Sequence, residues 1–117
     1  MTMNTLKDFV YFHDWQIDTL AVQTGNRLVL ELSLEERRAV VVFVGTSRCA
    51  VEHFGLLNIV REIRVLKPED VCYPRAQSLL AKSDRYSKAP APNVALVAAT
   101  AGAEITVEFD ALEIEER

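Results

Sequence analysis

The sequence predicts a single, mainly β domain spanning residues 1–117, α+β at the margin, in which an antiparallel twisted sheet closes towards a sandwich or half-barrel. Three observations predict this class: a hairpin pattern over residues 15–34, a wholly apolar run over residues 39–44, and a second hairpin over residues 93–116. A short N-terminal helix and one helical excursion near residues 75–85 complete the expected architecture. A chain of 117 residues suits one domain.

The N-terminal helix is predicted from a capping pattern and from a periodicity. Thr5 precedes Asp8 by three residues, which is the spacing of a capping box. One apolar face follows at intervals of three and four residues. It consists of Leu6, Phe9, Val10 and His13.

The first hairpin is predicted by alternation and by its turn. Residues 15–23 and 27–34 are rich in strand-forming side chains, and Gly25-Asn26 between them supplies the residues that adopt positive φ in tight turns. In the second arm, leucine occupies every second position from 28 to 34, which predicts a strand with one dry face.

The following segments are less uniform. Six apolar residues from Ala39 to Val44 predict a central strand buried on both faces. Residues 46–58 carry a weak signal with room for one more short strand. Residues 56–66 fit either a helical or a strand period, and their β-branched content favours a strand.

All four prolines lie between residues 67 and 93, which predicts a break in the sheet with a turn or two of helix and an exposed connection. In the closing hairpin, apolar residues alternate up to Phe109 and then resume one position out of phase at Leu112. A strand of period two cannot shift by one residue without an insertion, so we expect a β-bulge or kink near Asp110–Leu112.

The charge argues against a nucleic-acid partner. The net charge is −4 and the isoelectric point is about 5.2, with basic residues concentrated in 61–88 and acidic ones in 104–117. The N-terminus lacks the pattern of a signal peptide, and the chain has no apolar run of membrane-spanning length. We therefore expect a cytoplasmic protein with no membrane partner, whose two cysteines are free thiols.

His13 and Asp14 form the sharpest candidate for chemistry. Adjacent residues point to opposite faces of a strand and lie about 100° apart on a helix, so we do not expect these two side chains to meet. The favoured interpretation places His13 half-buried under the first helix, Asp14 in a chain-turning role, and Trp15 as the anchor of the sheet. The alternative is a catalytic His13 that is oriented by a remote carboxylate.

Other chemistry is not favoured, and we expect no cofactor. Two histidines and two cysteines are a ligand combination found in zinc sites, and the chain has His13, Cys49, His53 and Cys72. Their spacing, however, is not that of a closed structural zinc site. The serines lack a nucleophile-elbow pattern. We interpret the GTSR sequence after residue 44 as a strand exit. Three carboxylates of the closing hairpin are interpreted as a solvated sheet face: Glu104, Glu108 and Asp110.

Two segments are candidates for binding a partner protein. Tyr11, Phe12 and Trp15 cluster within five residues, and such aromatics dominate binding hot spots when they are exposed. The second candidate is the segment from Arg75 to Lys88. The residues singled out for an interaction surface or pocket are His13, Asp14, Trp15, Tyr11, Arg75, Arg85 and Tyr86.

The order of short motifs resembles small bacterial proteins of the YxiG-like, immunity-protein type of polymorphic toxin systems. The chain has an aromatic-His-Asp step at 12–14, an aromatic-Val-Gly strand end at 43–45, an N-I-V-x-E-I motif at 58–63, and an Ala-Gly-x-Glu turn at 101–104. Members have Ser or Ala after the His-Asp step, where this chain has Trp15. The resemblance implies a mainly β fold that binds or neutralises a partner protein, and it transfers no catalytic residues.

The leading hypothesis is therefore a non-enzymatic protein-interaction domain of immunity-like type. A small hydrolase or ligand-binding domain that uses His13 is the first alternative. A homo-oligomeric structural subunit, such as a homodimer, is the second.

Overall fold

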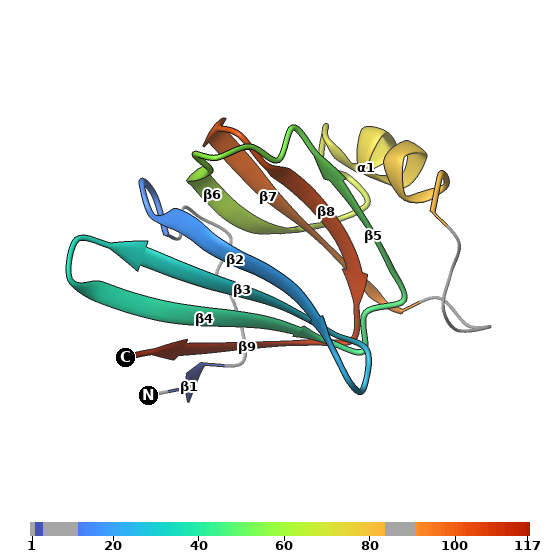
Figure 1. The fold of residues 1–117 in the computed structure, drawn as a ribbon. Coiled ribbons are helices and arrows are strands. Elements are labelled where there is room, and N and C mark those ends of the chain that lie inside the picture. The colour runs from blue at the N-terminus through green and yellow to red at the C-terminus, as the bar shows by residue number, and fades with distance from the viewer. Residues whose placement is uncertain (1, 4–11, 84–90) are drawn as a thin grey trace.

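A computed structural model describes residues 2–3, 12–83 and 91–117, and within them nine strands form one antiparallel sheet beside one helix (Figure 1). The mainly β class is confirmed. The strands are β1 (Thr2–Met3), β2 (Gln16–Gln23), β3 (Arg27–Leu34), β4 (Arg37–Val44), β5 (Arg48–Glu52), β6 (Ile59–Leu66), β7 (Asn93–Ala101), β8 (Glu104–Phe109) and β9 (Ala111–Glu116), and the helix is α1 (Tyr73–Leu80).

The sheet is open and strongly bent. Its strand order is β1-β9-β4-β3-β2-β6-β7-β8-β5, and it divides where β2 meets β6 through a single residue pair, Gln16 with Ile59. The two parts fold over each other, as Figure 1 shows, so that their inner faces enclose one core. This arrangement matches the expected half-barrel form of a twisted antiparallel sheet.

The main core lies between the two parts of the sheet. Residues of β3, β4 and β9 meet residues of β6, β7 and β8 there, and the rings of Phe43 and Phe109 pack edge to face with centroids 5.1 Å apart. The largest fully buried side chains besides these two rings are Leu30, Leu32, Ile63, Leu80, Ile105 and Ile114.

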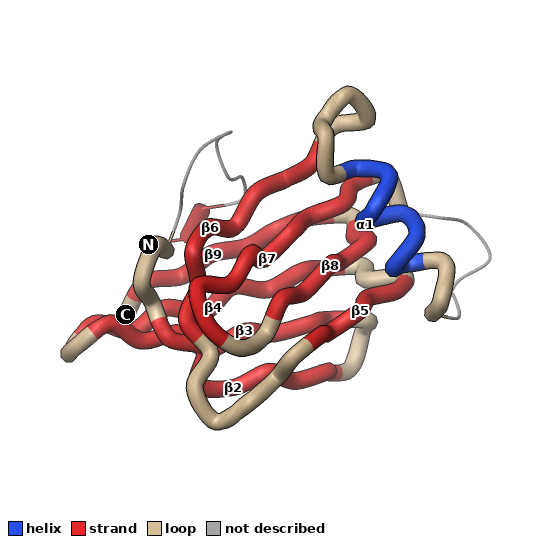
Figure 2. Tube along the Cα trace, turned by 90° about the horizontal axis from the view of Figure 1, so that it is seen from above, coloured by secondary structure: helices blue, strands red, loops and turns tan. Residues whose placement is uncertain are grey.

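Helix α1 covers the outer face of β7 and β8 and reaches β5 (Figure 2). Pro74 stands in its first turn, where a missing amide hydrogen costs nothing. Ala76 and Leu80 pack against Leu66, Val94 and Leu96 and form a second, smaller core. The helical excursion expected near residues 75–85 is therefore present over 73–80. It is the only helix in the described parts of the chain, and it is too short to cross a membrane.

The hairpins follow the sequence closely. β2 and β3 flank a turn in which Gly25 and Asn26 adopt φ of 85° and 58°. Residues 59–66 form a strand, as their β-branched content indicates, and residues 48–52 form the expected short strand.

The expected kink falls at Asp110. β8 ends at Phe109 and pairs with β7 and β5, whereas β9 begins at Ala111 and pairs with β4 and β1. The amide of Asp110 donates to the carbonyl of Val44 at 2.9 Å. The change of phase in the sequence therefore marks the point where the chain crosses from one part of the sheet to the other.

Two expectations change. The prediction that β4 is buried on both faces is wrong: Ala39, Val41 and Phe43 are buried, but Val40 and Val42 are half-buried on an outer face. These two valines line a surface hollow of about 400 Å³ together with charged residues of β3 and β9. Most of the expected N-terminal helix lies outside the described residues, but its last position, His13, lies in a turn.

Candidate functional site

His13 and Asp14 form a contact at a surface turn. His13 Nδ1 donates to the Arg61 carbonyl at 2.9 Å, and its Nε2 lies 3.4 Å from Asp14 Oδ1. The expectation that the two side chains point apart is wrong because the backbone is in neither a helix nor a strand here, with φ of 69° at Asp14. The side chains are 57% and 64% exposed, so the half-buried position expected for His13 is also wrong.

Trp15 belongs to the core. Its ring is buried, packs edge to face on Phe12 at 5.1 Å, and lies under the Arg37 guanidinium at 4.8 Å. The Trp15 carbonyl accepts from the amide of Val60 at 2.8 Å, and the Asp14 amide donates to the Val60 carbonyl at 2.8 Å. The turn is thereby tied to the start of β6.

The other residues singled out from the sequence do not join this turn. Tyr11, Arg85 and Tyr86 lie outside the described residues. Arg75, on α1, is exposed and forms ion pairs with Glu52 at 3.2 Å and with Glu104 at 3.0 Å. It links the helix to the ends of β5 and β8.

The segment 53–57, which we call the apolar loop, exposes three large side chains between β5 and β6. Phe54 and Leu57 are each 53% exposed, and Leu56 is fully exposed. This loop was not predicted from the sequence, because residues 46–58 carry a weak secondary-structure signal. The FGLL run at 54–57, apolar but outside any strand period, was the available signal.

Asn58 holds the apolar loop in one shape from inside the protein. Its buried side chain accepts from the amides of Gly55 at 3.0 Å and Ala103 at 2.9 Å, and it donates to the Gly55 carbonyl at 2.8 Å. Gly102, with φ of +75°, passes so close that a Cβ there would collide with the Leu57 carbonyl. Three of the four hydrogen-bonding positions of the amide are therefore used to fix the loop.

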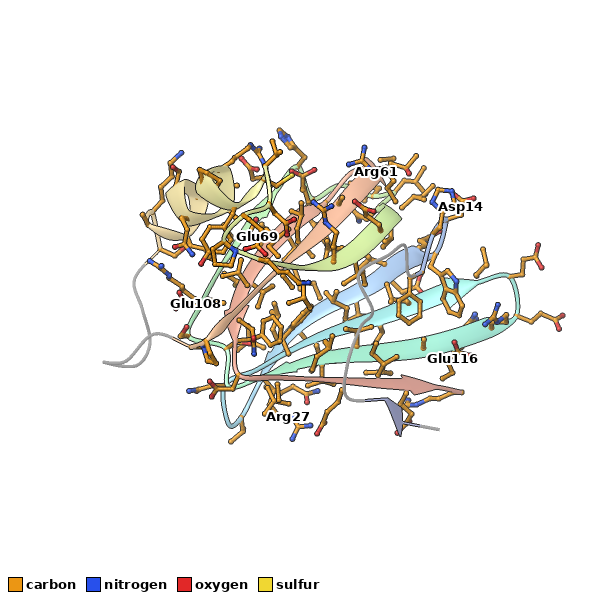
Figure 3. All side chains as sticks on the ribbon, turned by 180° about the vertical axis from the view of Figure 1, so that it is seen from behind. Asp14, Arg27, Arg61, Glu69, Glu108 and Glu116 are labelled. Atoms are coloured by element: carbon orange, nitrogen blue, oxygen red, sulfur yellow. The ribbon has the colours of Figure 1, made fainter. Side chains whose placement is uncertain are left out.

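The apolar loop and the His13–Asp14 turn share one end of the molecule. The amide of Ile17 donates to the Asn58 carbonyl at 2.8 Å. The carbonyl that accepts the hydrogen bond from His13 belongs to Arg61, three residues after Asn58. Figure 3 shows Asp14 and Arg61 together at this end, away from Arg27. The exposed apolar groups thus lie at the same end of the molecule as an exposed imidazole and an exposed carboxylate.

A second cluster is buried beneath α1. Glu108 is 3% exposed, and its carboxylate accepts from Ser47 Oγ and from Arg48 Nη2, the latter at 3.1 Å. The interpretation of Glu108 as part of a solvated sheet face is therefore wrong. Helix α1 covers this face, a consequence of tertiary packing that strand alternation does not reveal.

The guanidinium of Arg48 is occupied by structural contacts. Besides Glu108 it donates to the Leu80 carbonyl at 3.3 Å and to Gln77 Oε1 at 3.4 Å. These bonds satisfy the end of α1 and tie it to β5 and β8. The cluster serves the fold, since its charged donors are directed at the protein itself.

A hollow of about 590 Å³ lies between the end of β2 and the start of β5. Cys49 contributes to its wall, and burial raises the pKa of the Cys49 thiol. Cys72, the other free thiol, lies 3.5 Å from Arg64 Nη2. The zinc set considered from the sequence is not assembled: no three His, Cys, Asp or Glu residues of the described chain gather as metal ligands.

No family model, curated protein or solved structure matches this chain.

Proposed function

We propose that this domain acts by binding a partner protein, without catalysis, and that the apolar loop is its principal contact. The observation that carries the proposal is the full exposure of Leu56 between the half-exposed Phe54 and Leu57, on a loop held from within by Asn58.

Exposed apolar groups are costly in water unless something covers them. Burying a leucine or phenylalanine side chain is worth roughly 1.5–3 kcal/mol, so three neighbouring groups supply the core of a binding hot spot. The hydrogen bonds of Asn58 fix the loop before binding, which lowers the entropy that association costs.

The rim of this surface defines the partner's chemistry. His13 and Asp14, whose side chains are both more than half exposed, offer an imidazole and a carboxylate at this end of the molecule. The best complement is a protein with an apolar recess bordered by polar groups that can hydrogen-bond to His13 and Asp14. The immunity-type resemblance supports a toxin protein as this partner.

The first alternative, a hydrolase based on His13, receives less support from the geometry. A general base needs an orienting acceptor and a substrate pocket. The carboxylate beside His13 is the neighbouring Asp14, both side chains are more than half exposed, and neither lines the two larger hollows. A solvated turn outside these hollows suits recognition better than it suits catalysis.

Site-specific photo-crosslinking in the native cells tests this proposal. A photoreactive amino acid at position 56 is expected to capture one discrete protein in a defined ratio, whereas the same probe at position 71 is expected to capture none. Val71 is the matched control because it is also almost fully exposed but lies before α1. Equal crosslinking patterns from the two positions would contradict the proposal.

A further inference from the structure

Beyond its first residue pair, one edge of strand β2 is open among the described strands. It pairs with β6 only at Gln16, and the register with β3 then shifts between Ile17 and Thr19. An extra residue of this kind, Asp18, increases the local twist and turns a strand away from its neighbour. From Asp18 to Gln23, β2 pairs with β3 alone among the described strands.

The register shows which backbone groups point out of this edge. Leu34 and Arg37 flank a two-residue turn, so their backbone groups form a hydrogen-bonded pair between β3 and β4. In an antiparallel ladder every second pair is hydrogen-bonded, so Leu30 and Val41 also form such a pair. Leu28 and Leu30 therefore bond to β4 and not to β2. Their partners on β2, Val22 and Leu20, direct their amide and carbonyl groups away from β3.

The other side of the opening is protected differently. The carbonyl of Cys49 on β5 accepts a hydrogen bond from Ser83 Oγ at 2.8 Å, so the edge of β5 is already capped by the chain that follows α1. The edge of β2 from Thr19 to Gln23 has no lysine or proline, the residues that usually prevent pairing with another chain.

A hollow accompanies the open edge. The 590 Å³ hollow is bordered by Val22 and Leu28 on one side and by Ser47 and Cys49 on the other. Val22 is 81% exposed, although it lies on the same face of β2 as Leu20, which packs against the core. No group from the described residues therefore covers Val22 at this position.

We propose that an extended segment of a partner protein adds to β2 as a further antiparallel or parallel strand. Its backbone would bond to Leu20 and Val22, and one apolar side chain would enter the hollow over Leu28 and Cys49. This surface lies at the opposite end of β2 from the apolar loop, so the inference goes beyond the proposed function. A backbone edge recognises extended peptide in general, and the hollow selects an apolar residue within it.

A single strand fits this opening better than a second copy of the chain. Thr46, Ser47 and Arg48 line the far side of the hollow, so an added strand would lie between β2 and these residues. A second copy that paired through its own β2 would also bring its own β3, which is hydrogen-bonded to that β2, into the same opening.

A displayed library of random nine-residue peptides, selected on the whole protein, supplies the probe. Enriched peptides are expected to share an apolar residue and to lose at least tenfold in affinity for Val22→Pro. That substitution removes an outward amide but no bond to β3. Val22→Thr keeps the amide and is expected to bind within about threefold of the wild type, and Leu56→Ser is expected to leave peptide binding unchanged.

Hydrogen exchange on the wild-type protein provides a second readout that does not depend on a variant. The amides of Leu20 and Val22 are expected to exchange faster than that of Ala21 in the free protein and to become protected when a selected peptide is added. Failure to enrich any peptide, or enrichment of peptides that leave these amides unprotected, would overturn the proposal. So would a concentration-dependent dimer that protects the same amides, since the occupant would then be a second copy.

Discussion

Arg48 neutralises the carboxylate of Glu108 inside the protein, with Nη2 3.1 Å from Oε2 and Nε 3.3 Å from the same oxygen. The two side chains are only 12% and 4% exposed. Removal of one partner would break charge-assisted hydrogen bonds inside the protein, which costs far more than the intact pair contributes to stability.

The Arg48→Met substitution is therefore expected to lower the free energy of unfolding by about 3–5 kcal/mol, because it removes the guanidinium that bonds to the buried Glu108 carboxylate and to the end of α1. Urea denaturation followed by circular dichroism measures this. Arg75→Met is the matched control, since Arg75 pairs with Glu52 and Glu104 at the surface and its loss is expected to cost less than about 1 kcal/mol.

The double substitution of Arg48 and Glu108 by methionine separates charge burial from packing. It is expected to be more stable than Arg48→Met alone, since the buried carboxylate is removed together with the guanidinium. If Arg48→Met costs no more than Arg75→Met, the description of the pair as buried and mutually dependent is wrong.

The Asn58→Ala substitution is expected to loosen the apolar loop. It leaves the buried amide of Ala103 without its acceptor and frees Gly55, at a cost of about 1–3 kcal/mol per unsatisfied group. Hydrogen exchange of residues 53–57 is expected to accelerate more than that of the 24–26 turn. Uniform acceleration across both turns would indicate that Asn58 stabilises the whole fold and does not specifically shape the loop.

Glu35 holds an unfavourable backbone conformation in the turn between β3 and β4, with φ of 56°. Glycine adopts positive φ without the steric cost that other residues incur, about 1–2 kcal/mol. We expect Glu35→Gly to raise the free energy of unfolding by about 1 kcal/mol. Glu36→Gly, at the next position, where φ is not positive, is expected to lower it. Equal effects at the two positions would refute the assignment of strain to Glu35.

The Cys49 thiol is expected to be protected from alkylation. Burial raises its pKa, so native Cys49 stays protonated at pH values where an exposed thiol, with a pKa of about 8.5, has ionised. The contribution of the protonated Cys49 thiol to stability is complete at pH values below the ordinary thiol pKa. It declines as the pH rises from that pKa towards the raised pKa of the folded protein, because the thiol of the unfolded chain then ionises first. Iodoacetamide labelling between pH 7 and 10, native against urea-unfolded, measures this. Cys49 labelling at equal rates in both states would contradict it.

Much of the fold could be predicted from the sequence because its signals are local. The Gly25-Asn26 turn and the alternating leucines of β3 can each be recognised within a few consecutive residues. The change of phase after Phe109 located the crossing at Asp110, although the pattern alone did not show that β8 and β9 pair with different strands.

The candidate sites were harder to predict because tertiary contacts create them. Glu108 follows the alternation of a solvated face, and only the docking of α1 makes it buried. The turn that joins His13 to Asp14 depends on a φ of 69° at Asp14, which neither strand nor helix geometry anticipates. The apolar loop is fixed by Asn58 through Ala103, 45 positions along the chain.

The most direct test of the protein-binding account is titration calorimetry with the protein that is captured from position 56. The Leu56→Ser variant is expected to bind it at least tenfold more weakly than the wild type, which corresponds to about 1.4 kcal/mol. Val71→Ser, with an equally exposed side chain away from the apolar loop, is expected to bind it as the wild type does. Equal affinities of Leu56→Ser and wild type would contradict the account.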